Sequence, residues 1–245
     1  MKLARRYVEK PWGRTELPPQ FDPPAGRRIG EVWFTGGPDA PLLAKYIFTS
    51  ERLSIQVHPP AKTECWYVLA ADPGATIGLG LTRQCTAGEL RAAALDGSIE
   101  QLVDWRPVRA GDVFLVPSGT IHAIGAGLSL LEFQQNADVT YRLYDYGRGR
   151  ELHLDQAIAE ARPRPYPAAL AQHVGRGEER TLVDGPAFRL VYRRGDTLPD
   201  RRRWILPLDG VVRSGGDVAG PGDCLLLEPG DALTGGGAML IGAMP

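Results

Sequence analysis

Short apolar segments, separated by glycine and proline, make up most of the chain and predict a mainly β fold. Such segments, roughly four to eight residues long and bounded by turn residues, are typical of buried strands. They occur at residues 30–35, 42–48, 64–69, 75–81, 111–116 and 128–135. The 30 glycines and 21 prolines fit many short strands joined by tight turns better than they fit long helices.

Three short segments interrupt this strand pattern and predict helices. Thr86 is followed by Glu89, which is the spacing of a capping box, so a helix is expected over residues 86–96. A second short helical turn is expected at residues 99–103, and a further helix at residues 153–162.

The proline-rich segment Pro163–Pro167 is the predicted boundary between two parts, residues 1–162 and 163–245. The second part contains a weak repeat of the first, because PGDCLLLEPG at 221–230 resembles AGDVFLVP at 110–117 with one residue inserted. No histidine follows the repeat, so we expect a second β-sandwich without metal ligands. The alternative is that these strands extend the sheets of the first part.

The overall composition is that of an ordinary globular protein, with 43% hydrophobic residues, 23% charged residues and a net charge of −1. This charge argues against nucleic acid or a membrane surface as the main partner. Three cysteines without paired spacing argue against a disulfide framework or a zinc ribbon. The N-terminal residues lack the apolar run of a secretory signal, and no apolar stretch reaches membrane-spanning length, so we expect a reducing cytoplasm.

Residues 54–67 carry the most informative pattern in the chain. Gln56 and His58 alternate with apolar residues on a strand, so both side chains share one face. A turn at Pro59 and Pro60 follows, and the chain re-enters a strand at Glu64. This hairpin brings an amide, an imidazole and a carboxylate together, which are ligand types of a divalent-metal site.

His122 is the candidate for a further ligand, because it follows the turn and buried strand of residues 111–116. Taken alone, His58 or His122 is better interpreted as a buried, hydrogen-bonded core histidine. The two together, with Gln56 and Glu64 at their spacing, favour a metal site.

These segments resemble a known family. Residues 111–122 match the second cupin motif, and Gln56, His58 and Glu64 resemble the first, with glutamine in place of its first histidine. The strings SIQVHP at 54–59, KTECWY at 62–67 and PSGTIHAIG at 117–125 are similar to those of type I mannose-6-phosphate isomerases in their short bacterial form. The resemblance covers about residues 10–150.

The resemblance implies a mainly β cupin (jelly-roll) barrel with small helical additions and a degenerate, cupin-like C-terminal part. It implies an enzyme that interconverts mannose 6-phosphate and fructose 6-phosphate through a cis-enediol intermediate. One divalent metal ion, with zinc favoured, would be held by Gln56, His58, Glu64 and His122. The partner would be a small sugar phosphate, and the protein would be a monomer or a homodimer.

The reaction needs a base that moves a proton between C1 and C2 of the sugar. Glu132 is the first candidate, because its apolar neighbours would desolvate it and raise its pKa. An equally weighted alternative is that Glu132 pairs with an arginine inside the barrel. Asp138 is a weaker candidate for the base, and Lys62 could donate to a substrate oxygen or shuttle a proton.

The substrate phosphate needs cations, and the resemblance assigns Arg142 to the pocket, where it would stabilise the enediolate or bind the substrate. Ser54, Lys62 and Arg148 are further candidates for contacts with the substrate. Arg148 fits a surface position equally well.

One departure from the family is the short segment 59–63 between His58 and Glu64, where family members usually carry a longer insertion. A missing lid would alter which substrate enters. Two alternatives therefore stay open: a related cupin isomerase for another sugar phosphate, and a cupin that binds a sugar or metal without turnover.

Overall fold

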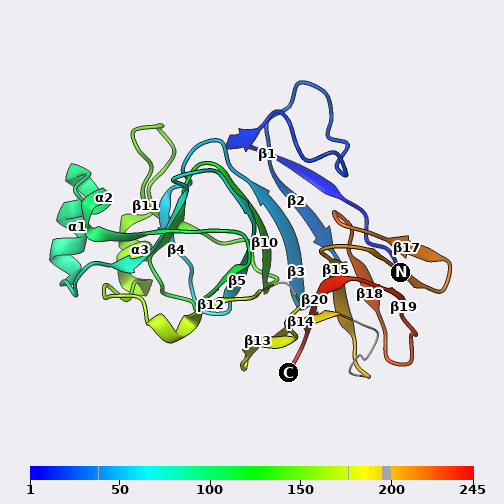
Figure 1. The fold of residues 1–245 in the computed structure, drawn as a ribbon. Coiled ribbons are helices and arrows are strands. Elements are labelled where there is room, and N and C mark those ends of the chain that lie inside the picture. The colour runs from blue at the N-terminus through cyan, green and yellow to red at the C-terminus, as the bar shows by residue number, and fades with distance from the viewer. Residues whose placement is uncertain (38, 176, 195–199) are drawn as a thin grey trace.

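The computed structural model describes residues 1–37, 39–175, 177–194 and 200–245, and strands dominate it (Figure 1). The strands are β1 (Arg6–Arg14), β2 (Ile29–Thr35), β3 (Leu42–Phe48), β4 (Ile55–Val57), β5 (Glu64–Ala71), β6 (Thr76–Leu81), β7 (Val103–Pro107), β8 (Asp112–Val116), β9 (His122–Ile124), β10 (Leu128–Gln135), β11 (Tyr141–Tyr144), β12 (Ala171–His173), β13 (Arg180–Asp184), β14 (Arg189–Arg194), β15 (Arg203–Pro207), β16 (Val211–Ser214), β17 (Asp217–Ala219), β18 (Leu225–Leu227), β19 (Thr234–Gly236) and β20 (Ala238–Ala243). The helices are α1 (Ala87–Asp96), α2 (Ile99–Leu102), α3 (Leu154–Glu160) and the 3₁₀ turn η1 (Ala168–Leu170).

The strands form a stack of sheets with the helices at one end of it, at the left in Figure 1. A five-stranded sheet, β11-β4-β9-β6-β7, lies next to a seven-stranded sheet, β1-β2-β3-β10-β5-β8-β12. A second five-stranded sheet, β13-β14-β20-β15-β18, and a three-stranded sheet, β17-β16-β19, complete the stack on the other side. The mainly β, cupin-like class predicted from the sequence is therefore confirmed.

The two N-terminal sheets do not close into a continuous barrel, which is compatible with the two packed sheets of a jelly roll. Strands β4 and β9 have only three residues each, and Pro59 and Pro60 follow one residue after the end of β4. Proline lacks the N–H that a ladder needs, so pairing cannot continue past such a strand end. The sheets instead pack face to face.

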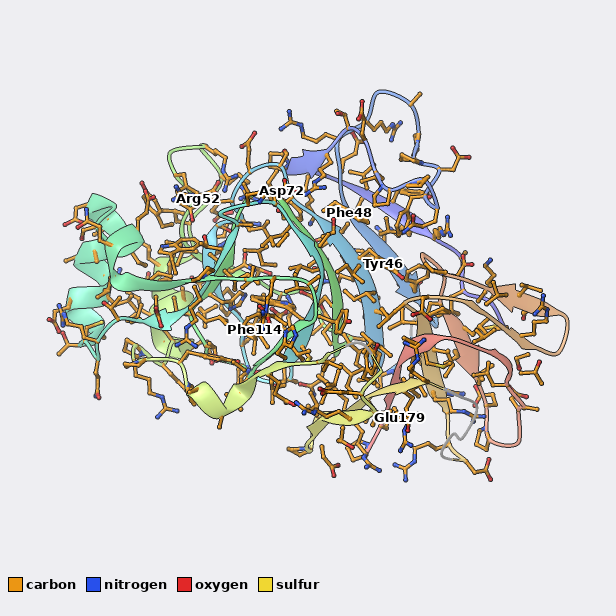
Figure 2. All side chains as sticks on the ribbon, in the orientation of Figure 1. Tyr46, Phe48, Arg52, Asp72, Phe114 and Glu179 are labelled. Carbon is orange, nitrogen blue, oxygen red and sulfur yellow. The ribbon has the colours of Figure 1, made fainter. Side chains whose placement is uncertain are left out.

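The seven-stranded sheet is covered on both of its faces. Successive side chains of β3 show this, because they pack alternately into two different cores. Tyr46 and Phe48 (Figure 2) project into a core shared with Trp204 and Phe188 of the C-terminal part. Ile47, between them in sequence, packs instead into the core between the two N-terminal sheets, as Phe114 of β8 does (Figure 2). Strands buried on both faces need apolar residues at nearly every position, which explains the nearly continuous apolar segments of the sequence.

The helices cover the outer face of the five-stranded N-terminal sheet, where Leu90 of α1 and Ala157 of α3 pack against Ile55 and Val57. Thr86 caps α1 with the predicted capping box: its side chain accepts from the Glu89 backbone N–H, and the Glu89 carboxylate accepts from the Thr86 N–H. The predicted helices at 86–96 and 99–103 are confirmed, and the third is shorter than residues 153–162. No helix among the described residues is long and apolar enough to cross a membrane.

The C-terminal part is a small sandwich with its own core around Ile205, Val212 and Ile241, as predicted. The chain also crosses the predicted boundary, because β12 pairs with β8 of the first part and Met1 donates to the Leu226 carbonyl. The division at residue 162 stays a prediction. The three cysteines are free and buried.

The weak repeat in the sequence corresponds to the same turn in both parts. Gly111 has φ of 90° and Gly222 has φ of 92°, a region that favours glycine. In each turn the following aspartate, Asp112 or Asp223, accepts from the backbone N–H three residues before it. The turn then leads into a buried strand in both cases, β8 and β18.

Candidate metal centre

The candidate ligands lie at the seam between the two N-terminal sheets. Gln56 of β4 is directly opposite His122 of β9, and both strands belong to the five-stranded sheet. Glu64 begins β5 in the seven-stranded sheet, and His58 lies in the connection between them. The short turn 59–63 allows this connection, because Ala61 adopts a positive φ of 66° and the Gly119 N–H donates to the His58 carbonyl.

Three of these side chains converge on one point. One ligand atom each from His58, Glu64 and His122 lies within 4.8 Å of the others, and all three residues are buried. His58 Nε2 lies 3.2 Å from Glu64 Oε2, and His122 Nε2 lies 3.5 Å from Glu64 Oε1. The hairpin and the second histidine therefore meet as the sequence predicts.

Hydrogen bonds on the far side of each ring set the histidine tautomers. His58 Nδ1 lies 3.0 Å from the Val139 carbonyl, and His122 Nδ1 lies 2.8 Å from the Thr120 carbonyl. A carbonyl can only accept, so each Nδ1 carries the proton and each Nε2 presents a lone pair. Both lone pairs face Glu64. Backbone carbonyls behind ligand histidines are the usual arrangement at metal sites.

The electrostatics keep these groups in the protonation states of metal ligands. Burial lowers the pKa of His58 to about 4, with Glu64 opposing the shift. Burial also lowers the pKa of His122. Burial raises the pKa of Glu64, but attraction to the positive charges that His58, His122 and Lys62 can carry outweighs it and holds that pKa well below its usual range. At neutral pH, two neutral imidazoles therefore surround a carboxylate.

This arrangement fits a divalent cation. Glu64 Oε2 is buried and has no hydrogen-bond partner among the described residues, and an unpaired buried charge is costly. A cation between the lone pairs and the carboxylate would remove that cost. Two imidazole nitrogens and a carboxylate oxygen form a donor set that zinc accepts, and iron, cobalt, nickel or manganese accept similar sets.

Gln56 lies beside the cluster with its amide Nε2 at 3.2 Å from His122 Nε2, while its Oε1 accepts from Ser54 Oγ at 3.0 Å. Rotation of the amide by a half-turn exchanges its oxygen and nitrogen. That rotation would direct the oxygen at the position a metal would occupy. The role of Gln56 as a fourth ligand stays a prediction.

A narrow cavity of about 70 Å³ opens at this cluster and gathers the predicted site residues. Eight residues are predicted as metal ligands, catalytic groups or main substrate contacts, and seven of them line this cavity. The eighth, His122, contacts Glu64 and Gln56. The seven are Ser54, Gln56, His58, Lys62, Glu64, Glu132 and Arg142. Asp138 also lines the cavity, whereas Arg148 does not.

Glu132 lies in the wall of the cavity as half of a buried ion pair. Its Oε1 accepts from Lys45 Nζ at 2.9 Å, and its Oε2 accepts from Trp66 Nε1 at 3.0 Å. The predicted ion-pair interpretation is thus correct in kind, but the partner is a lysine rather than an arginine. Burial raises the pKa of Glu132, and the nearby carboxylate of Glu64 raises it further, which is the direction expected for a base that works near neutral pH.

The sequence interpretation missed a second ion pair and Lys45 itself. Glu31 accepts from Trp33 Nε1 at 2.8 Å and lies 3.3 Å from Lys10 Nζ. Glu31, Lys10 and Lys45 line the cavity, whereas Trp33 does not. Lys45 Nζ also lies 4.8 Å from the Trp33 ring. Glu31 and Lys45 are single charges within apolar strands, and such an isolated charge was the available signal.

Lys62 and Arg142 approach the cluster from the remaining sides. Lys62 Nζ lies 3.1 Å from His58 Nε2 and 3.4 Å from Thr140 Oγ1. Burial lowers its pKa, with Glu64 opposing the shift. Arg142 is opposite Gln56 in the β11–β4 pair, and its Nε is buried without a hydrogen-bond partner among the described residues.

A larger open hollow of about 1190 Å³ lies elsewhere and contains none of these side chains. Its arginines already have partners: Arg28 binds Glu51, and Arg52 binds Glu100. The small cavity at the seam is therefore the candidate site.

Comparisons with known proteins agree with the sequence resemblance. No family model matches the chain. A mannose-6-phosphate isomerase of Streptococcus mutans is 41% identical over 171 residues, which is 62% of this chain and 54% of that protein. The chain thus spans about half the length of the relatives it matches.

The fold comparison covers nearly the whole chain. The crystal structure of the mannose 6-phosphate isomerase from Bacillus subtilis superposes with a TM-score of 0.79 at 25% identity, covering 99% of both chains. A mannose 6-phosphate isomerase bound with zinc and yttrium has a TM-score of 0.74 at 15% identity and covers 99% of this chain and 98% of its own. The predicted resemblance to mannose-6-phosphate isomerases is confirmed in sequence and in fold.

The ligand assignment predicts that His122→Ala abolishes stoichiometric metal binding, because it removes one of three converging donors. The protein should remain a folded β protein. The measurement is metal content by elemental analysis after dialysis, with circular dichroism to check the fold. His173→Ala is the matched control, since His173 is a partly exposed histidine paired with Asp112. Full metal content in His122→Ala would overturn the assignment.

Proposed function

We propose that this protein is a metal-dependent aldose–ketose isomerase that interconverts mannose 6-phosphate and fructose 6-phosphate through a cis-enediol intermediate. The observation that carries this proposal is the convergence of His58, Glu64 and His122 in one cavity with a buried acid, lysines and an arginine. The similarity to mannose-6-phosphate isomerases in sequence and fold supports the substrate assignment.

His58, Glu64 and His122, with Gln56 as a fourth ligand, would hold the metal ion, and zinc is the metal we propose. The zinc in one structural relative supports this choice, as does the mixed nitrogen and oxygen donor set. A divalent ion held there would polarise sugar oxygens and stabilise negative charge on the enediolate.

Glu132 is the proposed base that moves the proton between C1 and C2. It lines the cavity and is buried, and its raised pKa brings its basicity closer to neutral pH. Lys45 holds one carboxylate oxygen and Trp66 the other, so the side chain has a fixed orientation. The lone pair that takes the proton would be one not used by these two donors, since each carboxylate oxygen offers two.

Lys62, Arg142 and Ser54 are the proposed contacts with the substrate. Lys62 would donate to a sugar oxygen, and burial, which lowers its pKa, makes proton transfer from it easier. Arg142 would offset negative charge on the enediolate or bind the phosphate. Ser54, which is buried beside Gln56, would fix the orientation of that amide and of the sugar.

The remaining expectations stay predictions: a reducing cytoplasm, a monomer or homodimer, and the absence of nucleic-acid and membrane partners. The short turn 59–63 keeps another sugar phosphate open as an alternative substrate. A non-catalytic cupin is the less economical alternative, since it assigns no role to the buried acid and bases around the cluster.

The proposal predicts that chelator-stripped protein does not isomerise mannose 6-phosphate and that added zinc restores turnover. The reason is that a metal ion bound by the buried carboxylate and imidazoles would polarise the sugar oxygens and stabilise the enediolate. Fructose 6-phosphate formation, followed through coupling enzymes, is the measurement. Metal-loaded protein without turnover would contradict the proposal, and other sugar phosphates would then be screened.

Assignment of the base predicts that Glu132→Gln lowers kcat by about 10²- to 10⁴-fold, the usual contribution of a general base. Metal content should not change. Glu31→Gln is a matched control, because Glu31 also accepts from a tryptophan and pairs with a lysine in the same cavity. The control should retain kcat within about tenfold, well short of the loss expected for a base. An equal loss in both variants would identify a structural effect and remove Glu132 from the chemistry.

A further inference from the structure

Asp145, just after β11, is a buried carboxylate that holds two arginines. Its side chain is only 3% exposed. One of its oxygens accepts from Arg148 at 2.7 Å, and Arg150 donates to both oxygens, with Nε at 2.7 Å from Oδ2. A bidentate contact of this kind fixes both the position and the plane of a guanidinium group.

The two arginines point to different places. Arg148 donates to the Arg52 carbonyl at 2.8 Å and lies over the Tyr146 ring, away from the cavity. Arg150 lines the cavity of the candidate metal centre, with its side chain 26% exposed. The contact role that the sequence suggests for Arg148 therefore fits Arg150 better.

Arg150 shares the cavity wall with Arg142, whose buried Nε lacks a partner in the described part of the chain. Among the ion pairs of the described residues, Asp145 is shared by Arg148 and Arg150 alone, and Arg148 also lies 3.8 Å from Glu51. The guanidinium groups of Arg142 and Arg150 thus lie in one cavity wall, and both would attract an anion bound there.

We propose that Arg150, oriented by Asp145, binds the phosphate group of the substrate together with Arg142 and so sets the preference for phosphorylated sugars. The inference rests on the proposed function. A phosphate monoester carries a charge of about −1.5 to −2 at neutral pH, which is complementary to the guanidinium groups of Arg142 and Arg150 in the cavity wall. The planar fork of each arginine suits two phosphate oxygens, and Asp145 keeps Arg150 from turning towards solvent.

The test measures equilibrium binding of mannitol 6-phosphate to zinc-loaded protein by calorimetry. This ligand keeps the phosphate but has no carbonyl group, so it cannot isomerise and no turnover is required. Arg150→Met should weaken binding by about 10- to 100-fold, the usual effect of losing hydrogen bonds to a charged group. The KM for mannose 6-phosphate should rise by a similar factor, while kcat changes much less.

Arg148→Met is the matched control, because it removes the other partner of Asp145 without removing a residue from the cavity wall. It should bind mannitol 6-phosphate as the wild type does. Unchanged binding in Arg150→Met would overturn the proposal, as would equal losses in both variants, because an equal loss indicates a structural role of the Asp145 cluster.

The design separates failure of this inference from failure of the proposed function. The wild type could turn over mannose 6-phosphate and yet bind mannitol 6-phosphate no better than Arg150→Met does. That result would leave the isomerase function intact and overturn the phosphate site. Arg150-dependent binding without turnover would support the phosphate site and overturn the function. A wild type that binds no mannitol 6-phosphate overturns the inference.

Discussion

The position of one buried carboxylate, Glu64, constrains the rest of the site. It lies between the unprotonated nitrogens of His58 and His122, and one of its oxygens has no hydrogen-bond partner among the described residues. The two imidazole lone pairs lie 3.2 and 3.5 Å from the Glu64 carboxylate and are repelled by its negative charge. A cation between them would remove this repulsion. The site therefore fits a metal ion, and its candidate ligands come from two different sheets and from the connection between them.

The relative position of the two N-terminal sheets depends on the elements that pack against their outer faces. The seven-stranded sheet carries Glu64, Glu132 and Lys45 towards the cavity, and its other face packs against the C-terminal sheet. Phe133, next to Glu132 in sequence, contacts Phe188 and Trp204 of that sheet. The described residues of the C-terminal part thus contribute no candidate ligand, but they stabilise the wall that carries the charged residues.

Features encoded by local spacing could be predicted from the sequence. The capping box of α1, the turns at Gly111 and Gly222, and the ligands on either side of the short turn 59–63 all depend on residues a few positions apart. The meeting of His122 with this hairpin required a recognised motif, because the two are far apart in sequence. The cupin-like class could be predicted from that motif, but the motif says little about where short strands stop pairing.

Features set by strand register or by loop conformation could not be predicted. Lys45 faces Glu132 because β3 and β10 pair in one register, and a shift of one residue would have turned the lysine to the opposite face. Arg148 and Arg150 are separated by one glycine in a loop where Tyr146, Gly147 and Gly149 all have positive φ. Side chains in such a loop do not alternate regularly between two faces, so sequence spacing does not tell which arginine faces the cavity.

X-ray absorption at the zinc edge of the metal-loaded protein tests the central claim, that the metal lies between the two imidazoles and Glu64. The account predicts scattering from two imidazole rings, with nitrogen and oxygen neighbours at about 2.0–2.2 Å. A spectrum without imidazole scattering, or with sulfur at about 2.3 Å, would contradict it, because Cys65, the cysteine adjacent to Glu64, packs into the core on the opposite face of the sheet.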